Sequence, residues 1–228
     1  MLSDAVQTVA RETIEIVGAS RTDSGAHAKG QVCHFDTVRP IRPAKWKRAI
    51  NDLLPRDLAV VGAQWVNKAF HSRFWASDRW YRYRILNGKP DPHRSRYTYH
   101  YSQALDHAAM HEAAQLLVGT RDFFAFTQLI EKGTNTVRTV RSIRVREIHD
   151  EVWIDVVATA YARGMMRRIS GALWEIGRGA RNPDSLLALL AQREKDKVHW
   201  PTVLPASGLC LMKVNYGRSP REQVRHDP

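Results

Sequence analysis

A loop between two strand-like segments constrains the fold of this chain more than any other stretch. It runs from Gly18 to Phe35 and reads GASRTDSGAHAKGQVCHF. Two segments flank the turn residues of this loop, at 13–17 and at 31–35. Both contain β-branched residues and alternate in polarity, which is typical of half-buried strands. The serine and glycine residues between them suit turns and positive φ. The sequence therefore predicts an exposed loop held by rigid elements, a place where functional residues concentrate.

The side chain of this loop with the clearest chemical use is Asp23, which follows Arg21 and Thr22. A guanidinium within a few ångströms lowers the pKa of a carboxyl group and favours its ionised form. An ionised aspartate is a usable nucleophile or general base. The spacing alone leaves a second interpretation open, in which Asp23 only caps a turn through its side chain.

The charge of the chain points to an anionic partner. Lys and Arg number 35 against 23 Asp and Glu, a formal net charge of +12 with a pI near 10.1. Nucleic acid is the first candidate for such a partner. We expect no membrane partner, because no basic amphipathic helix is evident that would bind a membrane surface. No apolar run approaches the roughly 20 residues needed to span a bilayer, and the first residues lack the features of a signal peptide. Cys33 and Cys210 are too few for a disulfide framework, which favours a cytoplasmic location.

Aromatic and basic side chains alternate along residues 79–85. In a strand Tyr81 and Tyr83 point to one face, whereas Trp80, Arg82 and the next arginine point to the other. Aromatic rings interleaved with arginines suit stacking on bases and pairing with phosphates. A core strand with a solvated basic face is the alternative.

Two helices carry clusters of positive charge. Residues 44–51 predict a short helix whose Lys45, Lys47 and Arg48 form either a phosphate-facing patch or a solvated face. In residues 163–178, apolar side chains recur at helical spacing and place Arg163 and Arg167 on other faces.

The remaining chain alternates between strands and helices. The patterns predict a strand at 58–65, a helix at 106–118, a strand pair at 143–158 with its turn at 149–150, a helix beginning near 182 and a closing strand at 205–216. We expect a loop at 131–136 and a mobile polar tail at 217–228.

Five of these segments, in order, resemble the TruA-type tRNA pseudouridine synthases. The signature loop of that family is matched by Arg21, Thr22, Asp23, Gly25, His27, Gly30, Gln31, Val32, His34 and Phe35. The other four are an R-x-Y-R-Y strand at 79–83, a D-F-x-x-F motif at 122–126, an arginine helix from residue 165 and a G-L-x-L-x-x-V-x-Y strand at 208–216.

The resemblance implies an α+β pseudouridine synthase fold. Two related α/β halves with mainly antiparallel sheets would join around a central basic cleft. The first half would be residues 1–74, with the catalytic loop 18–35, and the second half residues 75–228. The second half would hold the tyrosine strand 79–85 and the arginine helix 163–178. The first strand of the family has no counterpart here, since residues 2–12 correspond to the tail of the helix that follows it.

The resemblance also implies a reaction and its residues. The chain would convert uridine to pseudouridine in the tRNA anticodon stem-loop, at positions 38, 39 and 40, as a homodimer without cofactor or metal. Asp23 would be the catalytic aspartate, with Arg167 paired to it, Tyr81 stacked in the site and Arg21 beside it. We expect the tRNA to contact Thr22, His27, Arg82, Arg163, Lys45 and Arg48.

Two other classes of function remain open at this point. A non-catalytic RNA-binding protein, or a degenerate synthase, would need only the basic surface and the aromatic residues. A metal-dependent nuclease could use Asp23, His27, Cys33 and His34 as ligands. Against the metal, adjacent residues of a strand point to opposite faces, and the chain has no C-x-x-C or H-E-x-x-H spacing.

Overall fold

The computed structural model describes residues 1–128, 134–192 and 199–217. The part of the predicted loop at 131–133 and the tail from 218 on lie outside the described residues. No helix in the described ranges combines the length and the apolar character needed to cross a bilayer.

The chain forms two compact units. The first gathers Met1–Ser20 and Val32–Ala76 together with Tyr216, and the second gathers Arg21–Gln31 and Ser77–Asn215. Most of the loop around Asp23 therefore belongs with the later part of the chain. The domain boundary predicted at residue 74 stays a prediction.

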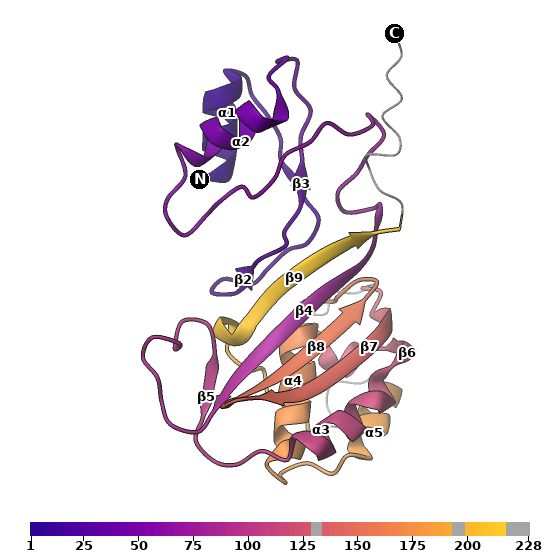
Figure 1. Cartoon of the computed structure of the whole chain (residues 1–228). Coiled ribbons are helices and arrows are strands. Elements are labelled where there is room, and N and C mark those ends of the chain that lie inside the picture. Colours follow the sequence, from indigo (N-terminus) through magenta and orange to yellow (C-terminus); the bar gives the residue numbers. More distant parts are fainter. Residues whose placement is uncertain (129–133, 193–198, 218–228) are drawn as a thin grey trace. The chain divides into compact units, whose positions relative to one another are not determined.

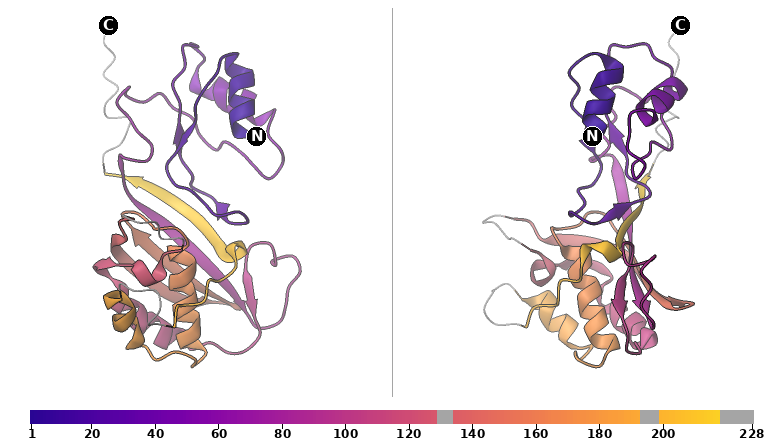
Figure 2. Two further views of the ribbon diagram at one scale, coloured as in Figure 1. Left: turned by 180° about the vertical axis from the view of Figure 1, so that it is seen from behind. Right: turned by 90° about the vertical axis from the view of Figure 1, so that its left-hand side faces the viewer.

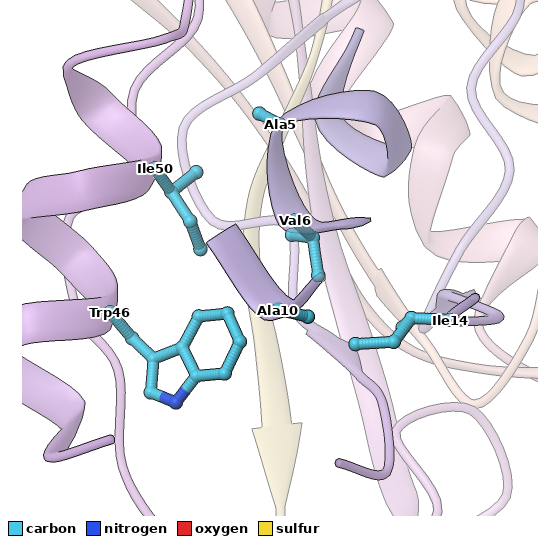
Figure 3. Close-up of a cluster of buried hydrophobic side chains, with 6 residues drawn as sticks. All are labelled: Ala5, Val6, Ala10, Ile14, Trp46 and Ile50. Carbon is cyan, nitrogen blue, oxygen red and sulfur yellow. The ribbon is translucent and has the colours of Figure 1, made fainter. Parts of the chain in front are cut away.

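The first unit is built on two helices, α1 (Leu2–Ala10) and α2 (Pro43–Asn51). Proline at the first position of α2 suits a helix start, because that residue needs no hydrogen bond from its backbone nitrogen. The two helices pack through a small apolar core, drawn in Figure 3, which consists of Ala5, Val6, Ala10, Ile14, Trp46 and Ile50. Strands β1 (Val17–Gly18) and β3 (Cys33–His34) pair antiparallel. The strand predicted at 31–35 is thus reduced to Cys33–His34, and of the strand predicted at 13–17 only Val17 lies in a strand.

The strand predicted at residues 58–65 is wrong. This segment is irregular, and Val61 and Trp65 are exposed. The side chain of Asn51 bonds both the backbone nitrogen and the carbonyl oxygen of Val60, at 2.7 and 2.9 Å. A side-chain amide thus satisfies backbone groups that a neighbouring strand would satisfy in a sheet.

The second unit is a mainly antiparallel sheet covered by helices, with strand order β2-β9-β4-β8-β7-β6 and β5 paired to β4 (Figure 1). Its strands are β2 (His27–Ala28), β4 (Ala76–Asn87), β5 (Tyr99–Tyr101), β6 (Gly119–Asp122), β7 (Val137–Ile148), β8 (Glu151–Ala158) and β9 (Leu209–Tyr216). Figure 2 shows β9 beside β4 from two further directions. The α+β class with a mainly antiparallel sheet is therefore confirmed.

Three helices accompany this sheet: α3 (His107–Ala114), α4 (Met165–Gly177) and α5 (Ser185–Ala191). Helix α3 packs on both β7 and α4. The predicted turn between β7 and β8 is confirmed, with His149 in the left-handed region at φ 55°. The alternation predicted for β4 is also confirmed, because Tyr81, Tyr83 and Ile85 are buried while the residues between them are partly exposed.

Candidate active site

The backbone around Asp23 is a tight turn fixed to strand β9. The nitrogen of Ala26 donates to the carbonyl oxygen of Asp23 at 3.0 Å, and Gly25 has φ +83°. Glycine suits the third position of such a turn because it adopts positive φ without strain. Past the turn, β2 pairs in parallel with β9, and a Cβ on Gly30 would lie 2.3 Å from the carbonyl oxygen of Met212. Only glycine permits this close approach, so the loop is held firmly against the sheet.

The carboxylate of Asp23 is paired with Arg167 on the first turn of α4. Arg167 Nη1 lies 3.0 Å from Asp23 Oδ2, with exposed side-chain fractions of 20% and 32%. The Nε of the same guanidinium donates to the carbonyl oxygen of Leu204 at 2.7 Å. Two bonds from one planar group fix its orientation, so the carboxylate is held in place while part of it remains open to solvent.

Tyr81 reaches the same loop from strand β4. Its ring is buried and packs edge-on against Tyr161, with the ring centroids 4.8 Å apart. Its hydroxyl donates a long hydrogen bond of 3.4 Å to the carbonyl oxygen of Arg21. Tyr161 is itself anchored by donating to the carbonyl oxygens of Val156 and Arg79, at 2.8 and 3.2 Å, and burial raises its pKa. The side chain of Tyr81 is therefore held in a fixed position, and its hydroxyl contacts the backbone of Arg21, two residues before Asp23.

The other predicted substrate contacts of this unit lie on the loop, on β2 and just before α4. Arg21 and Thr22 are exposed on the loop, and Arg163 is exposed just before α4. His27 follows the turn and donates from Nε2 to the carbonyl oxygen of Arg96 at 2.8 Å. Arg21, Thr22 and His27 lie within four residues of Asp23 along the chain, and Arg163 lies four residues before Arg167.

The structure does not bring Arg82 to Asp23. Its side chain lies on the face of β4 opposite Tyr81, where it makes two bonds to the carboxylate of Asp155 at 2.8 and 3.0 Å. Its guanidinium also lies 3.8 Å from the ring centroid of Trp153. A buried carboxylate and an aromatic ring already occupy this arginine, and its contact with substrate stays a prediction. Lys45 and Arg48 are exposed on α2 of the first unit.

Three of the four residues considered as metal ligands have other side-chain partners, and the fourth, Cys33, is a free cysteine on β3. His34 Nδ1 lies 2.9 Å from the hydroxyl of Ser72, whereas Asp23 and His27 make the contacts given above. Among the described residues, no three His, Cys, Asp or Glu side chains come together in a group that could hold a metal ion.

Two parts of this arrangement were missed from the sequence. The carbonyl oxygen of Leu204 orients Arg167, and any residue type offers such an oxygen. Tyr161 supports Tyr81 although it is 80 residues away along the chain, and only its aromatic character in an otherwise small-residue stretch hinted at packing.

Comparison with known proteins decides the family. Residues 113–217 match the family described as tRNA pseudouridine synthase. The tRNA pseudouridine synthase A of Brevibacillus brevis is 38% identical over 213 residues, which cover 93% of this chain and 86% of that protein. The chain belongs to the tRNA pseudouridine synthase A family. The resemblance predicted from the sequence is thereby confirmed.

Other members of the tRNA pseudouridine synthase A family match to a similar extent. The Moorella thermoacetica protein is 39% identical over 93% of this chain and 86% of its own length. The Aliivibrio fischeri protein is 38% identical over 94% of this chain and 82% of its own length. The similarity therefore includes the loop around Asp23 as well as the sheet and helices that follow it.

Proposed function

We propose that this chain converts uridine to pseudouridine in the anticodon stem-loop of tRNA, at positions 38, 39 and 40, with Asp23 as the catalytic carboxylate. Membership of the family makes the chain an isomerase that acts on tRNA. The position in the tRNA and the roles of individual residues are the proposal.

The observation that carries the proposal is the pair between Asp23 and Arg167. It joins the exposed loop to the first turn of α4, at an Nη1 to Oδ2 distance of 3.0 Å. The positive charge balances the carboxylate without covering it. An oriented and partly exposed carboxylate, on a loop whose backbone a fixed tyrosine contacts, is what a covalent or base-catalysed reaction on a nucleotide requires.

The reaction itself exchanges one bond for another. The bond from N1 of the base to C1′ of the ribose breaks, a bond from C5 to C1′ forms, and the hydrogen on C5 is replaced while N1 gains one. Atoms and electrons balance without an oxidant or a cofactor. Asp23 supplies the nucleophile or base for this exchange, and Tyr81 stacks on the base or takes the proton from C5.

The substrate reaches the site as a flipped-out nucleotide. A uridine stacked in a stem hides the atoms that react, so the enzyme must take it out of the stack. Arg21 and Arg163 pair with the phosphates on either side, and Thr22 and His27 contact the same nucleotide. The net charge of +12 and the exposed Lys45 and Arg48 attract the rest of the tRNA.

The resemblance supports two further parts of this proposal. The chain acts as a homodimer in which one tRNA spans both subunits, and it works in the cytoplasm with its tRNA substrate. Light scattering of the protein with and without tRNA gives the number of subunits in the complex directly.

The experiment that tests the site compares two arginines of the same helical segment. We expect Arg167→Ala to lower kcat by about 100-fold, because it removes the charge that orients the carboxylate. Arg178→Ala, which removes a guanidinium lying over Trp174 beyond the end of α4, is the matched control and should keep the wild-type rate. Equal rates for the two variants would rule out the role given to Arg167.

The position of the modification is tested on a synthetic anticodon stem-loop. Uridines at 38, 39 and 40 are replaced one at a time by cytidine, and pseudouridine is mapped by carbodiimide labelling after incubation with the enzyme. Labelling should follow the uridines at these three positions. Modification elsewhere in intact tRNA, with none in the stem-loop, would overturn the proposed substrate site.

A further inference from the structure

Strand β4 leads into β5 through a wide loop at residues 88–98 (Figure 1). Tyr97 in this loop has 47% of its surface exposed. Among the aromatic side chains described in the second unit, all others are buried or only partly exposed. A large ring left in solvent at one place is a candidate contact for a partner.

The backbone on both sides of Tyr97 is fixed. The carbonyl oxygen of Arg96 accepts a hydrogen bond from His27 Nε2 at 2.8 Å, and that of Thr98 accepts one from the hydroxyl of Ser207 at 3.3 Å. Thr98 is itself buried. The ring of Tyr97 lies against the ring of His27, with centroids 4.8 Å apart and planes at 49°. The tyrosine is therefore exposed on a supported backbone.

A cluster of charged side chains anchors the loop at 88–98 to the start of β8. The carbonyl oxygen of Arg94 accepts from the nitrogen of Tyr97 at 2.8 Å, and the guanidinium of Arg94 pairs with Asp91 and Asp150, each at 2.7 Å. The same guanidinium lies 3.3 Å from the buried carboxylate of Glu151, the first residue of β8. Rigid attachment lowers the entropy lost when a ligand stacks on the ring.

We propose that Tyr97, supported by His27, is a stacking platform for an unpaired nucleobase next to the target uridine. This inference rests on the proposed function, which supplies an RNA with nucleotides on either side of the flipped base. His27 links the platform to the catalytic loop, because it follows directly on the turn from Asp23 to Ala26.

The chemistry of the surroundings favours RNA as the occupant. The exposed side chains in the same loop include Lys89, His93 and Arg96, which suit a phosphate backbone beside the stacked base. Stacking accepts any base, so the platform would hold the flanking nucleotide whatever its identity. Besides its proposed contact with the nucleotide, His27 positions the platform by holding Arg96 and the ring of Tyr97.

The test measures stacking directly and without turnover. Asp23→Asn protein is mixed with an anticodon stem-loop that carries 2-aminopurine on one side or the other of the target uridine, and fluorescence and Kd are recorded. Tyr97→Ala, Tyr97→Leu and Tyr97→Phe are compared in this background. Leucine keeps an apolar side chain without a π face, whereas phenylalanine keeps the ring.

We expect quenching at one of the two flanking positions with tyrosine or phenylalanine at residue 97, and its loss with alanine or leucine. The Kd of the stem-loop should rise about tenfold for Tyr97→Ala, within the range for removal of one stacked base. In the active enzyme the same change should raise KM by a similar factor and leave kcat nearly unchanged. His27→Ala should also weaken the quenching. Tyr97→Phe keeps the ring and should therefore keep the wild-type KM.

Equal quenching and equal Kd in the tyrosine and alanine proteins would overturn the proposal. So would a change in oligomeric state for Tyr97→Ala with RNA binding unaltered, which would assign the ring to a protein interface. Failure of the wild-type chain to isomerise uridine would refute the proposed function instead, and the fluorescence comparison would still decide the role of Tyr97.

Discussion

Replacing Gly171 by alanine should destabilise the protein, although alanine is the better helix former. Gly171 lies in the middle of α4, where the exchange from glycine normally stabilises by about 0.5–1 kcal/mol. Here a Cβ would lie 1.8 Å from the carbonyl oxygen of Thr202. Removing that clash requires more than about 1 Å of backbone movement, and such overpacking costs roughly 1–3 kcal/mol or more.

The segment that would have to move is held in place. The nitrogen of Thr202 donates to the buried carboxylate of Glu175 at 3.0 Å, and its hydroxyl bonds the same carboxylate oxygen. Two residues later, the carbonyl oxygen of Leu204 orients Arg167. The clash should therefore reduce both the stability of the second unit and the alignment of the arginine with Asp23.

Thermal unfolding followed by circular dichroism measures the first effect. We expect a net loss of about 2 kcal/mol and a Tm about 4–8 °C lower. Gly62→Ala is the control, because a Cβ at this position would meet no atom within 4 Å. Its Tm should stay within a degree or two of wild type, and an unchanged or raised Tm for Gly171→Ala would refute the reasoning.

Two further predictions concern charge. Replacing Lys45 and Arg48 together by alanine should make the slope of log K against log salt for tRNA binding less negative by about 1 to 2, and an unchanged slope in filter binding between 50 and 200 mM salt would place α2 away from the RNA. The second concerns Asp150, whose pKa is lowered to about 2 by its hydrogen bond from Arg94. The stabilisation from this carboxylate is fully present above its unfolded pKa near 4 and is lost as the pH falls through about 2, so the difference in Tm between wild type and Asp150→Asn should shrink in acid. A difference that is constant with pH would contradict it.

Local periodicity was sufficient to predict several elements. The alternation of Tyr81 and Tyr83 with polar residues gave strand β4, and the helical spacing of apolar residues gave α4. These patterns work because they record which side of an element is buried. The apolar run at residues 58–65 led to a wrong prediction because such a pattern does not show whether a strand has a neighbour to pair with. Here the side chain of Asn51, and not a second strand, satisfies the backbone of Val60.

The details of the site depended on contacts that periodicity does not encode. Asp155, which binds Arg82, is 73 residues away from it along the chain. The close approach of Thr202 to Gly171 involves a backbone carbonyl, which leaves no trace in residue type. The motifs indicated candidate side chains, whereas distance and orientation came from the tertiary structure.

The measurement that tests the central claim most directly is release of tritium from tRNA labelled at C5 of its uridines, comparing wild type with Asp23→Asn. This change keeps the size of the side chain and removes its charge, and the fraction of tRNA bound is measured in the same samples. We predict release by the wild type and none by the variant, with tRNA affinity nearly equal. Release at the wild-type rate by Asp23→Asn would contradict the role of Asp23 as the catalytic carboxylate.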